Sequence, residues 1–168
     1  KEAVQQLINP KTNKTKEIKV MDISYRVGDR VIQLVNQPED GVFNGDIGVI
    51  AAIFRKNENV EKKEQIVIAF DEKEVVYERE NFNHFMHAYC ISIHKSQGSE
   101  FPIVILPVIS TYNRMLRKNL LYTAITRSKN SLIICGDKHV FLRGVTTADT
   151  HMRYTSLIER LESRFQAD

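Results

Sequence analysis

The sequence has 168 residues, among them 24 basic and 21 acidic side chains, and a formal net charge of +3. Its composition, 42% hydrophobic and 27% charged, is typical of a globular protein and excludes an intrinsically disordered chain, a collagen-like fibre and a disulfide scaffold. Its apolar runs are far shorter than the roughly 20 residues that span a bilayer, so we expect no membrane partner.

The start of the chain has no initiator methionine, and Val4, Leu7 and Ile8 already follow helical spacing. We therefore expect the sequence to be a piece of a longer protein. Cys90 and Cys135 both lie in apolar runs, which predicts free, buried thiols in a reducing and therefore cytoplasmic compartment.

The first half of the chain is rich in predicted strands. An apolar, β-branched run at 29–35 suits a strand buried on both faces, as in a parallel sheet. Three further β-rich runs lie at 46–54, 65–70 and 74–77. Residues 71–73 are short enough for a hairpin turn, so residues 45–85 are predicted to form a small antiparallel β-barrel or meander.

Strand and helix patterns alternate in the second half. Apolar runs predict strands at 88–93, 103–108 and 132–135. A helix over 114–128 is predicted because its apolar residues repeat along one face. A capping-box pattern at Ser156 predicts a further helix, with an apolar face made of Leu157, Ile158, Leu161 and Phe165.

Charge is unevenly distributed along the chain. The net charge is +1 over residues 1–44, −3 over 45–85 and +5 over 86–168. Because phosphate binding needs a local cationic surface, the C-terminal half is the better candidate for contact with a polyanion.

A polar segment, Ser-Ile-His-Lys-Ser-Gln-Gly-Ser-Glu at 92–100, interrupts the apolar runs. Ligands of α/β proteins bind at such strand ends. The serine hydroxyls, His94 and Lys95 can all donate hydrogen bonds to a phosphate, and Gly98 permits a tight turn. The composition alone is equally consistent with a solvated polar turn.

A second segment, Leu-Tyr-Thr-Ala-Ile-Thr-Arg at 121–127, ends the predicted helix. The planar guanidinium of Arg127 can bind a phosphate through two parallel hydrogen bonds. An arginine in this position more commonly complements the helix dipole, so this residue by itself indicates little.

Together the two segments are far more specific. They resemble motifs V and VI of the superfamily 1 helicases, most closely those of the RecD-like branch, which includes the alpha subunits of exodeoxyribonuclease V. Residues 28–36, Gly-Asp-Arg-Val-Ile-Gln-Leu-Val-Asn, and 42–48, Val-Phe-Asn-Gly-Asp-Ile-Gly, resemble the segments that lead into the β-barrel insert of that branch.

The resemblance implies an α/β fold. Residues 1–44 and 86–168 would form a split RecA-like lobe (domain 2A), with a parallel sheet like that of the P-loop NTPases. Residues 45–85 would form an inserted SH3-like β-barrel (domain 2B). The first RecA-like lobe, which carries the phosphate-binding loop in these helicases, would lie in another part of the same protein.

The resemblance also implies roles for individual residues. Arg127 would be the arginine finger, Glu100 would accept a hydrogen bond from the nucleotide ribose, and Gly98 would let the backbone approach the nucleotide. The implied contacts to single-stranded DNA are Ser92, where the family commonly has threonine, His94 and Lys95. Asn36 and Asn44 are additional candidates for contacts to the DNA backbone, although asparagine in loops is more often a turn former.

Two further residues, Gln97 and Tyr122, lie between the two implied sites and are candidates for coupling them; packing is an equally good explanation of Tyr122. His84 and His87 have the spacing of a metal pair but no third ligand nearby in the sequence, so we expect no metal site.

The activity implied by the family is ATP-dependent, 5′-to-3′ movement on single-stranded DNA, with ATP and Mg²⁺ bound between the two lobes. Other DNA-repair proteins are possible partners. No Gly-x-x-x-x-Gly-Lys-Ser/Thr motif occurs in the sequence, and no acidic metal-binding motif follows an apolar strand, so this chain alone should not hydrolyse ATP.

Two alternatives remain open at the level of sequence. The chain could act as a nucleic-acid-binding or protein-docking module through its β-barrel, although the −3 charge of residues 45–85 argues against unaided DNA binding by that part. It could also be the helicase part of a TraA-type relaxase, which shares these motifs.

Overall fold

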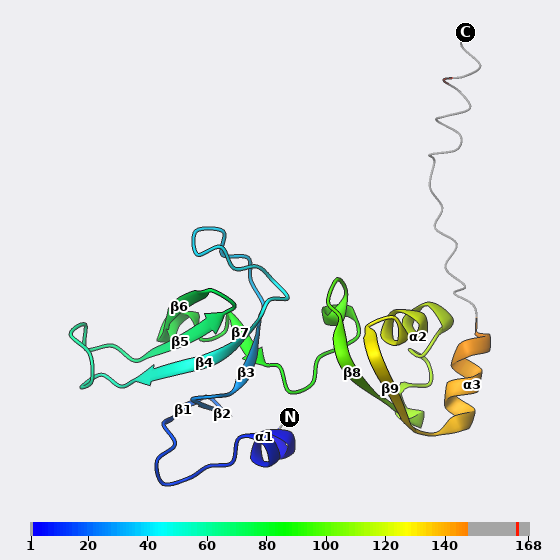
Figure 1. Cartoon of the computed structure of the whole chain (residues 1–168), viewed down its shortest axis with the longest axis horizontal. Coiled ribbons are helices and arrows are strands. Elements are labelled where there is room, and N and C mark those ends of the chain that lie inside the picture. Colours follow the sequence, from blue (N-terminus) through cyan, green and yellow to red (C-terminus); the bar gives the residue numbers. More distant parts are fainter. Residues whose placement is uncertain (1, 148–163, 165–168) are drawn as a thin grey trace. The chain divides into compact units, whose positions relative to one another are not determined.

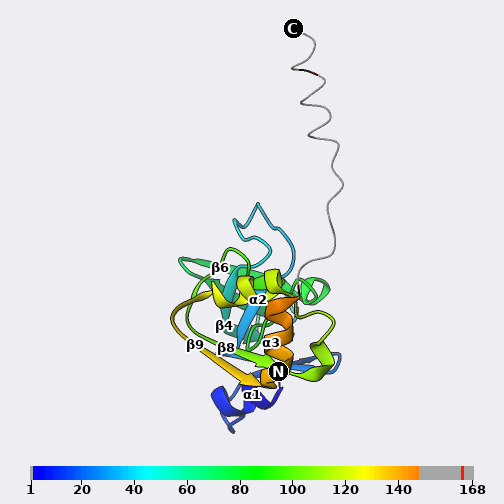
Figure 2. The same ribbon diagram turned by 90° about the vertical axis from the view of Figure 1, so that its right-hand side faces the viewer.

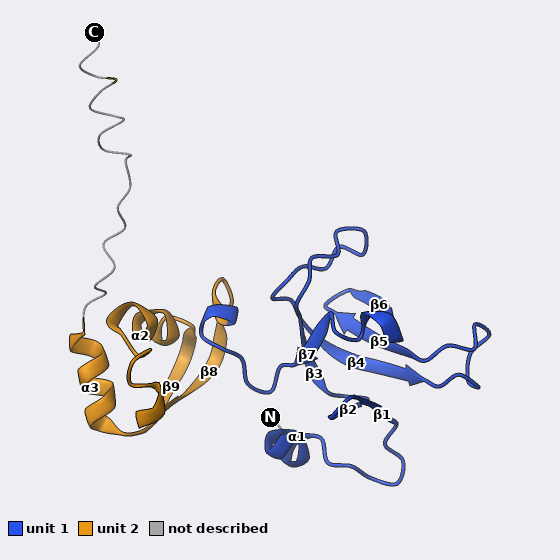
Figure 3. Ribbon diagram, turned by 180° about the vertical axis from the view of Figure 1, so that it is seen from behind, with its two compact units in different colours: residues 1–95 blue, residues 96–168 orange. Residues whose placement is uncertain are grey.

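The computed structural model describes residues 2–147 and 164, and divides the chain into two compact units. Unit 1 comprises Lys1–Lys95 and unit 2 comprises Ser96–Asp168 (Figure 3). Each unit has its own sheet and its own layer of packed side chains, so the two are described separately.

Unit 1 is built mainly from antiparallel strands. A short helix is followed by a hairpin of two strands and then by a five-stranded sheet in the order β6-β5-β4-β3-β7 (Figure 1). The elements are α1 (Glu2–Ile8), β1 (Glu17–Val20), β2 (Ile23–Arg26), β3 (Arg30–Gln33), β4 (Ile47–Phe54), β5 (Gln65–Phe70), β6 (Lys73–Glu78), the 3-10 helix η1 (Arg79–Asn81) and β7 (Phe85–His87).

The hydrophobic pattern explains the strands of this sheet. In β5, Ile66, Ile68 and Phe70 are buried and alternate with half-buried neighbours, as expected for a strand with one face on the core. The β5–β6 hairpin turns at residues 71–72, where Asp71 adopts a left-handed conformation with φ 47°. The predicted strands at 46–54, 65–70 and 74–77 and the predicted turn are therefore confirmed.

The core of unit 1 is a single cluster of apolar side chains. Tyr25, Tyr77 and Phe82 place their rings edge-on or tilted around Phe85, at centroid distances of 5.1 to 6.3 Å. The cluster also contains aliphatic residues of β3, β4 and β5, among them Val31, Ile50, Ile53, Ile66 and Ile68. This core holds β3 and β7 against the middle of the sheet.

The run at 29–35 does not belong to a parallel sheet. Its strand, β3, pairs antiparallel with both β4 and β7, so that expectation is wrong. A strand at the centre of an antiparallel sheet can be buried on both faces, and a short apolar run then looks the same in either kind of sheet. The expected strand at 88–93 is also absent, because the residues after β7 form bends, turns and the 3-10 helix η2 (His94–Ser96).

The boundaries of the units differ from the predicted domain boundaries at residues 45 and 85. The five-stranded sheet extends beyond 45–85 on both sides, because β3 and β7 pair within it. Contacts therefore group all of Lys1–Lys95 together. How this division corresponds to domains 2A and 2B stays a prediction.

Unit 2 has an α/β arrangement. Strands β8 (Phe101–Val108) and β9 (Ser128–Gly136) pair in parallel, and the helix α2 (Lys118–Ile125) lies between them in the chain. Helix α3 (Lys138–Thr146) follows β9, and the 3-10 helix η3 (Ser110–Tyr112) precedes α2. Both α-helices pack against the strand pair and against each other (Figure 2). The predicted strands at 103–108 and 132–135 are confirmed, and the predicted helix at 114–128 is present in a shorter form.

The packing of unit 2 is one-sided. Leu106 and Val108 of β8 are buried, as are Leu121 and Ala124 of α2. Residues at alternate positions of β8 point to the opposite face and are exposed, among them Ile103 at 61% and Ile105 at 65%. One face of the parallel pair is thus covered by helices, and the other is open within the described part of unit 2.

The structure also differs from the sequence predictions for the two cysteines and for the first helix of the chain. Cys90 and Cys135 are both exposed rather than buried, because Cys90 lies in the irregular segment after β7 and Cys135 lies in a strand with little side-chain cover. The helix predicted at Ser156 lies outside the described residues. At the other end of the chain, the predicted helical spacing corresponds to α1, but Leu7 is 83% exposed and the buried residue of that helix is Gln5.

Candidate functional site

The polar segment at 92–100 crosses from unit 1 to unit 2 and contains the short helix η2. Ser92 and His94 are exposed, Lys95 is half-buried, and the Lys95 amide donates to Ser92 Oγ over 3.4 Å. Gln97 is exposed as well. Gly98 has φ +82°, a left-handed conformation that favours glycine, although a Cβ there would meet no atom within 4 Å.

Arg127 lies just beyond α2 and contacts the end of that polar segment. Its Nη1 donates to the carbonyl of Ser99 over 3.1 Å, and the amide of Phe101 donates to the Arg127 carbonyl over 2.8 Å. Its Nε and Nη2 donate to Thr123 O and Thr126 Oγ1, each over 3.1 Å. Within unit 2, therefore, the two motif-bearing segments are joined directly through Arg127.

Glu100 lies in the same part of unit 2, between Ser99 and Phe101. Its Oε2 is 3.2 Å from the Lys129 Nζ, and both side chains are more than half exposed. An ion pair this exposed contributes at most about 1 kcal/mol. The carboxylate therefore stays accessible to another hydrogen-bond donor.

Tyr122 is exposed on α2 at 69%, so it does not pack in the core. It borders a groove of about 620 Å³ on α2, together with Leu121, Ile125 and Val145. Coupling and packing both stay predictions for this residue.

Asn36 and Asn44 lie far along the chain from the polar segment, in the loop between β3 and β4. Both are exposed, and the Asn44 amide donates to Asn36 Oδ1 over 2.9 Å. Asn36 therefore stabilises the loop itself, as expected of a turn-forming asparagine. Both remain candidates for DNA contact through exposure alone.

The sequence interpretation missed a buried carboxylate in unit 1, directly before β3. The side chain of Asp29 is fully buried, and both of its oxygens accept hydrogen bonds. Oδ1 accepts from Asn9 Nδ2 at 2.7 Å and from the Tyr89 hydroxyl at 2.8 Å. Oδ2 accepts from Gln5 Nε2 at 2.6 Å and from the Arg26 amide at 2.8 Å, and lies 3.0 Å from His87 Nε2.

These contacts change the ionisation of the groups involved. Burial by itself disfavours the Asp29 carboxylate, but the hydrogen bonds from His87, the Arg26 amide, Asn9 and Tyr89 outweigh it and lower its pKa. Burial and the Asp29 charge together raise the pKa of Tyr89 to about 12. The only sequence signal was an aspartate directly before an apolar strand, which is more commonly a turn residue.

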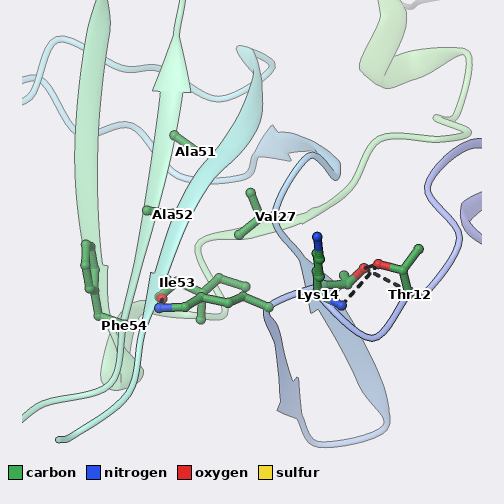
Figure 4. Close-up of a pocket in the computed structure, with 9 residues that line it drawn as sticks. Thr12, Lys14, Val27, Ala51, Ala52, Ile53 and Phe54 are labelled. Carbon is green, nitrogen blue, oxygen red and sulfur yellow. Dashed lines mark hydrogen bonds between the residues drawn. The ribbon is translucent and has the colours of Figure 1, made fainter. Parts of the chain in front are cut away.

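A shallow pocket of about 510 Å³ opens beside β4 in unit 1 (Figure 4). It is lined by apolar side chains, among them Val27, Ala51 and Ile53, and by the polar residues Thr12 and Lys14. None of the residues implicated by the motifs lines it. We therefore do not assign the candidate site to this pocket.

Within residues 2–147, no group of three or more histidine, cysteine, aspartate or glutamate side chains is arranged to hold a metal ion. His87, considered above as half of a metal pair, instead faces Asp29. None of the helices in the described part of the chain is long and apolar enough to cross a membrane.

Two family models match successive parts of the chain. The model of the SH3 domain of ATP-dependent RecD-like DNA helicases matches residues 2–70, and that of the UvrD-like helicase C-terminal domain matches residues 87–135. The first match includes α1 and β1–β5, and the second includes both motif-bearing segments.

Similar proteins of known name point in the same direction. The chain is 30% identical to the RecBCD enzyme subunit RecD of Buchnera aphidicola over 122 residues, which covers 71% of this chain and 19% of that protein. It is 26% identical to the ATP-dependent RecD2 DNA helicase of Deinococcus radiodurans over 160 residues, which covers 95% of this chain and 21% of that protein. The chain thus spans about a fifth of the length of these relatives.

A solved structure shares the fold. The Pif1 helicase from Bacteroides, in complex with ADP-AlF3 and ssDNA, aligns with a TM-score of 0.57 and 17% identity over 99% of this chain and 43% of that one. The two matched domain models in their order, the motifs at 92–100 and 121–127 and the RecD relatives show that the chain belongs to the RecD-like family of superfamily 1 helicases.

Proposed function

We propose that this chain is the C-terminal part of an ATP-dependent DNA helicase that moves 5′-to-3′ on single-stranded DNA in the cytoplasm. The observation that carries the proposal is the contact between Arg127 and Ser99, because it joins the motif implied to bind DNA to the motif implied to act on ATP. The direction of movement rests on the resemblance to the RecD-like branch alone.

The residues near this contact suit a nucleotide chemically. A guanidinium fits the oxygens of a transferring phosphoryl group, and an exposed carboxylate fits the hydroxyls of a ribose. Arg127 and Glu100 would take these two roles, and the left-handed Gly98 would leave the backbone uncovered beside them. Mg²⁺ would bind together with ATP, held by residues of the N-terminal RecA-like lobe, and would neutralise part of the phosphate charge.

The residues before η2 suit a DNA backbone. A helicase that moves along DNA must hold the sugar–phosphate chain without reading its sequence, and hydroxyl, imidazole and ammonium groups do this without base contacts. Ser92, His94 and Lys95 supply these groups, and the first two are exposed. The similar Bacteroides Pif1 structure is a complex with ssDNA, which supports a single strand as the ligand.

The proposal predicts that the whole protein hydrolyses ATP faster when single-stranded DNA is added, and separates DNA strands in an ATP-dependent manner. The isolated chain should do neither, because its sequence lacks the phosphate-binding loop. Failure of the whole protein to hydrolyse ATP with DNA present would contradict the proposal.

A double substitution tests the DNA site. In the whole protein, Ser92→Ala with His94→Ala should weaken single-strand affinity about fivefold or more, since each lost phosphate contact is worth about 0.5–1.5 kcal/mol. The affinity for ATP should change little. Fluorescence anisotropy with a labelled oligonucleotide and with a labelled nucleotide measures both.

The matched control is Ser131→Ala with His139→Ala, which removes the same two residue types from exposed positions in unit 2 outside the motifs. It should bind DNA like the unsubstituted protein. An equal loss of DNA and nucleotide affinity in the first double variant would mean that Ser92 and His94 support the fold instead.

The alternative module function, in which the sheet of unit 1 docks a protein or nucleic acid, makes a different prediction. Binding through phosphates weakens steeply as salt rises, whereas binding to a protein surface does not. A TraA-type relaxase would share the helicase activity and differ only outside this chain. Docking to other DNA-repair proteins also belongs among the possible functions of the whole protein.

A further inference from the structure

The segment that leaves the five-stranded sheet is fixed to Asp29 at two points. His87, the last residue of β7, places its Nε2 3.0 Å from Asp29 Oδ2, and Tyr89 donates its hydroxyl to Asp29 Oδ1 over 2.8 Å. Residues two apart in an extended segment project to the same side, so one carboxylate receives both. Between them, the Ala88 amide donates to Arg30 O over 2.8 Å.

The carboxylate is itself held from the opposite side. Gln5 Nε2 and Asn9 Nδ2, from α1 and the residue after it, donate to Oδ2 and Oδ1 over 2.6 and 2.7 Å. The Arg26 amide, at the end of β2, adds a third contact. With both oxygens held by three contacts from two other segments, the Asp29 side chain cannot rotate to follow Tyr89.

We propose that the Asp29–Tyr89 contact sets the position of the single-strand binding segment, so that Tyr89 is a positioning residue for Ser92 and His94. This inference rests on the proposed function. Tyr89 is the last residue tied to the buried carboxylate before the segment that carries the exposed candidates, and Cys90, which follows it, is exposed.

The chain between Tyr89 and the candidate DNA-binding residues is short, so fixing Tyr89 restricts where those residues can lie. An extended chain advances at most about 3.5 Å per residue, so fixing Tyr89 confines Ser92 to within about 10 Å of it and His94 to within about 17 Å. Without the hydroxyl contact, the chain loses its tie to Asp29 at residue 89 and keeps the one at His87. The DNA-binding segment then samples more positions, and binding DNA must order it at an entropic cost.

The test is Tyr89→Phe in the whole protein. The substitution removes one hydroxyl and leaves Asp29 Oδ1 with its bond from Asn9, so the fold should persist. We expect the dissociation constant for a single-stranded oligonucleotide to rise about three- to tenfold. The DNA concentration for half-maximal ATP hydrolysis should rise in parallel, while turnover at saturating DNA and the KM for ATP stay unchanged.

The matched control is Tyr77→Phe. The Tyr77 hydroxyl also donates over 2.8 Å to a buried side-chain oxygen of the same unit, but Tyr77 lies in β6 and its acceptor is Gln33 Oε1 instead of Asp29. It should lower the thermal unfolding temperature and leave DNA affinity unchanged, which separates a positioning effect from a loss of stability.

The outcomes are distinguishable. Normal DNA affinity in Tyr89→Phe, or an equal loss in Tyr77→Phe, would overturn the positioning role while the proposed function stands. A loss of turnover at saturating DNA in Tyr89→Phe would also overturn it, because a positioning residue for DNA should be compensated by excess DNA. If the unsubstituted protein does not bind single-stranded DNA, both the proposed function and this inference fail.

Discussion

Replacing Arg127 with alanine in the whole protein is expected to lower ATP turnover by about 10³-fold or more, and to leave the affinity for ATP nearly unchanged. A guanidinium that reaches the transferring phosphoryl group acts where charge develops in the transition state, and arginine fingers of other NTPases contribute about 10³–10⁵ in rate. An interaction made mainly in the transition state changes turnover far more than ground-state binding. Steady-state hydrolysis with saturating DNA and binding of a labelled nucleotide measure the two effects.

The contacts of Arg127 require two controls for this experiment. The side chain also donates to Ser99 O and Thr123 O, so its removal could loosen unit 2. Arg127→Lys keeps the charge but loses the planar fork, and it too should be severely impaired. Arg143→Ala removes an exposed arginine from the last turn of α3 and should retain full turnover. Turnover of Arg127→Ala within tenfold of the unsubstituted protein would remove this residue from the finger role.

Replacing Asp29 with alanine is expected to lower the free energy of unfolding of unit 1 by about 3–5 kcal/mol. The side chain is fully buried and its two oxygens serve contacts from Gln5, Asn9, Tyr89 and the Arg26 amide, besides His87. Without the Asp29 carboxylate, these donors lose their acceptor. Breaking a buried charged network costs a similar free energy of unfolding in other proteins. Urea unfolding followed by circular dichroism measures the change.

The matched control for Asp29 is Asp46→Ala. Asp46 is an exposed aspartate whose Oδ2 accepts a bond from the Phe43 amide over 2.8 Å. Its removal should cost less than about 1 kcal/mol. Similar losses for the two variants would show that the Asp29 network contributes no more to the stability of unit 1 than an exposed turn does.

The same carboxylate should make the stability of unit 1 depend on pH. Because the hydrogen bonds lower the pKa of Asp29 in the folded state, the ionised form contributes stability that is fully present above the unfolded pKa of about 4. That stability is lost as the pH falls through the lower, folded pKa. Asp29→Asn should show a smaller loss between pH 7 and pH 3 than the unsubstituted chain, and an equal loss in both would assign the acid sensitivity to other groups.

The sequence by itself determined the local structure wherever a periodic pattern was long enough. The alternation in 65–70, the short turn after it and the parallel strands on either side of the 114–128 pattern all appear in the structure. It also determined the family. The combination of two motifs, their spacing and the segments that lead into β4 is far more specific than any single residue. A motif is a local property of the chain, so it survives without knowledge of the tertiary contacts.

Only the tertiary structure decided which sheet the short apolar runs join. The run at 29–35 pairs antiparallel in unit 1, and the run at 88–93 forms no strand, although both have similar composition. Strand pairing and burial depend on residues that are distant in the sequence. For the same reason, the sequence neighbours of Cys135 did not reveal that it is exposed. The Asp29 network is the clearest case: its donors Gln5, Asn9 and Tyr89 lie 20 to 60 residues away from it in the sequence. No local pattern marks a polar residue as buried when its partners are brought to it only by folding.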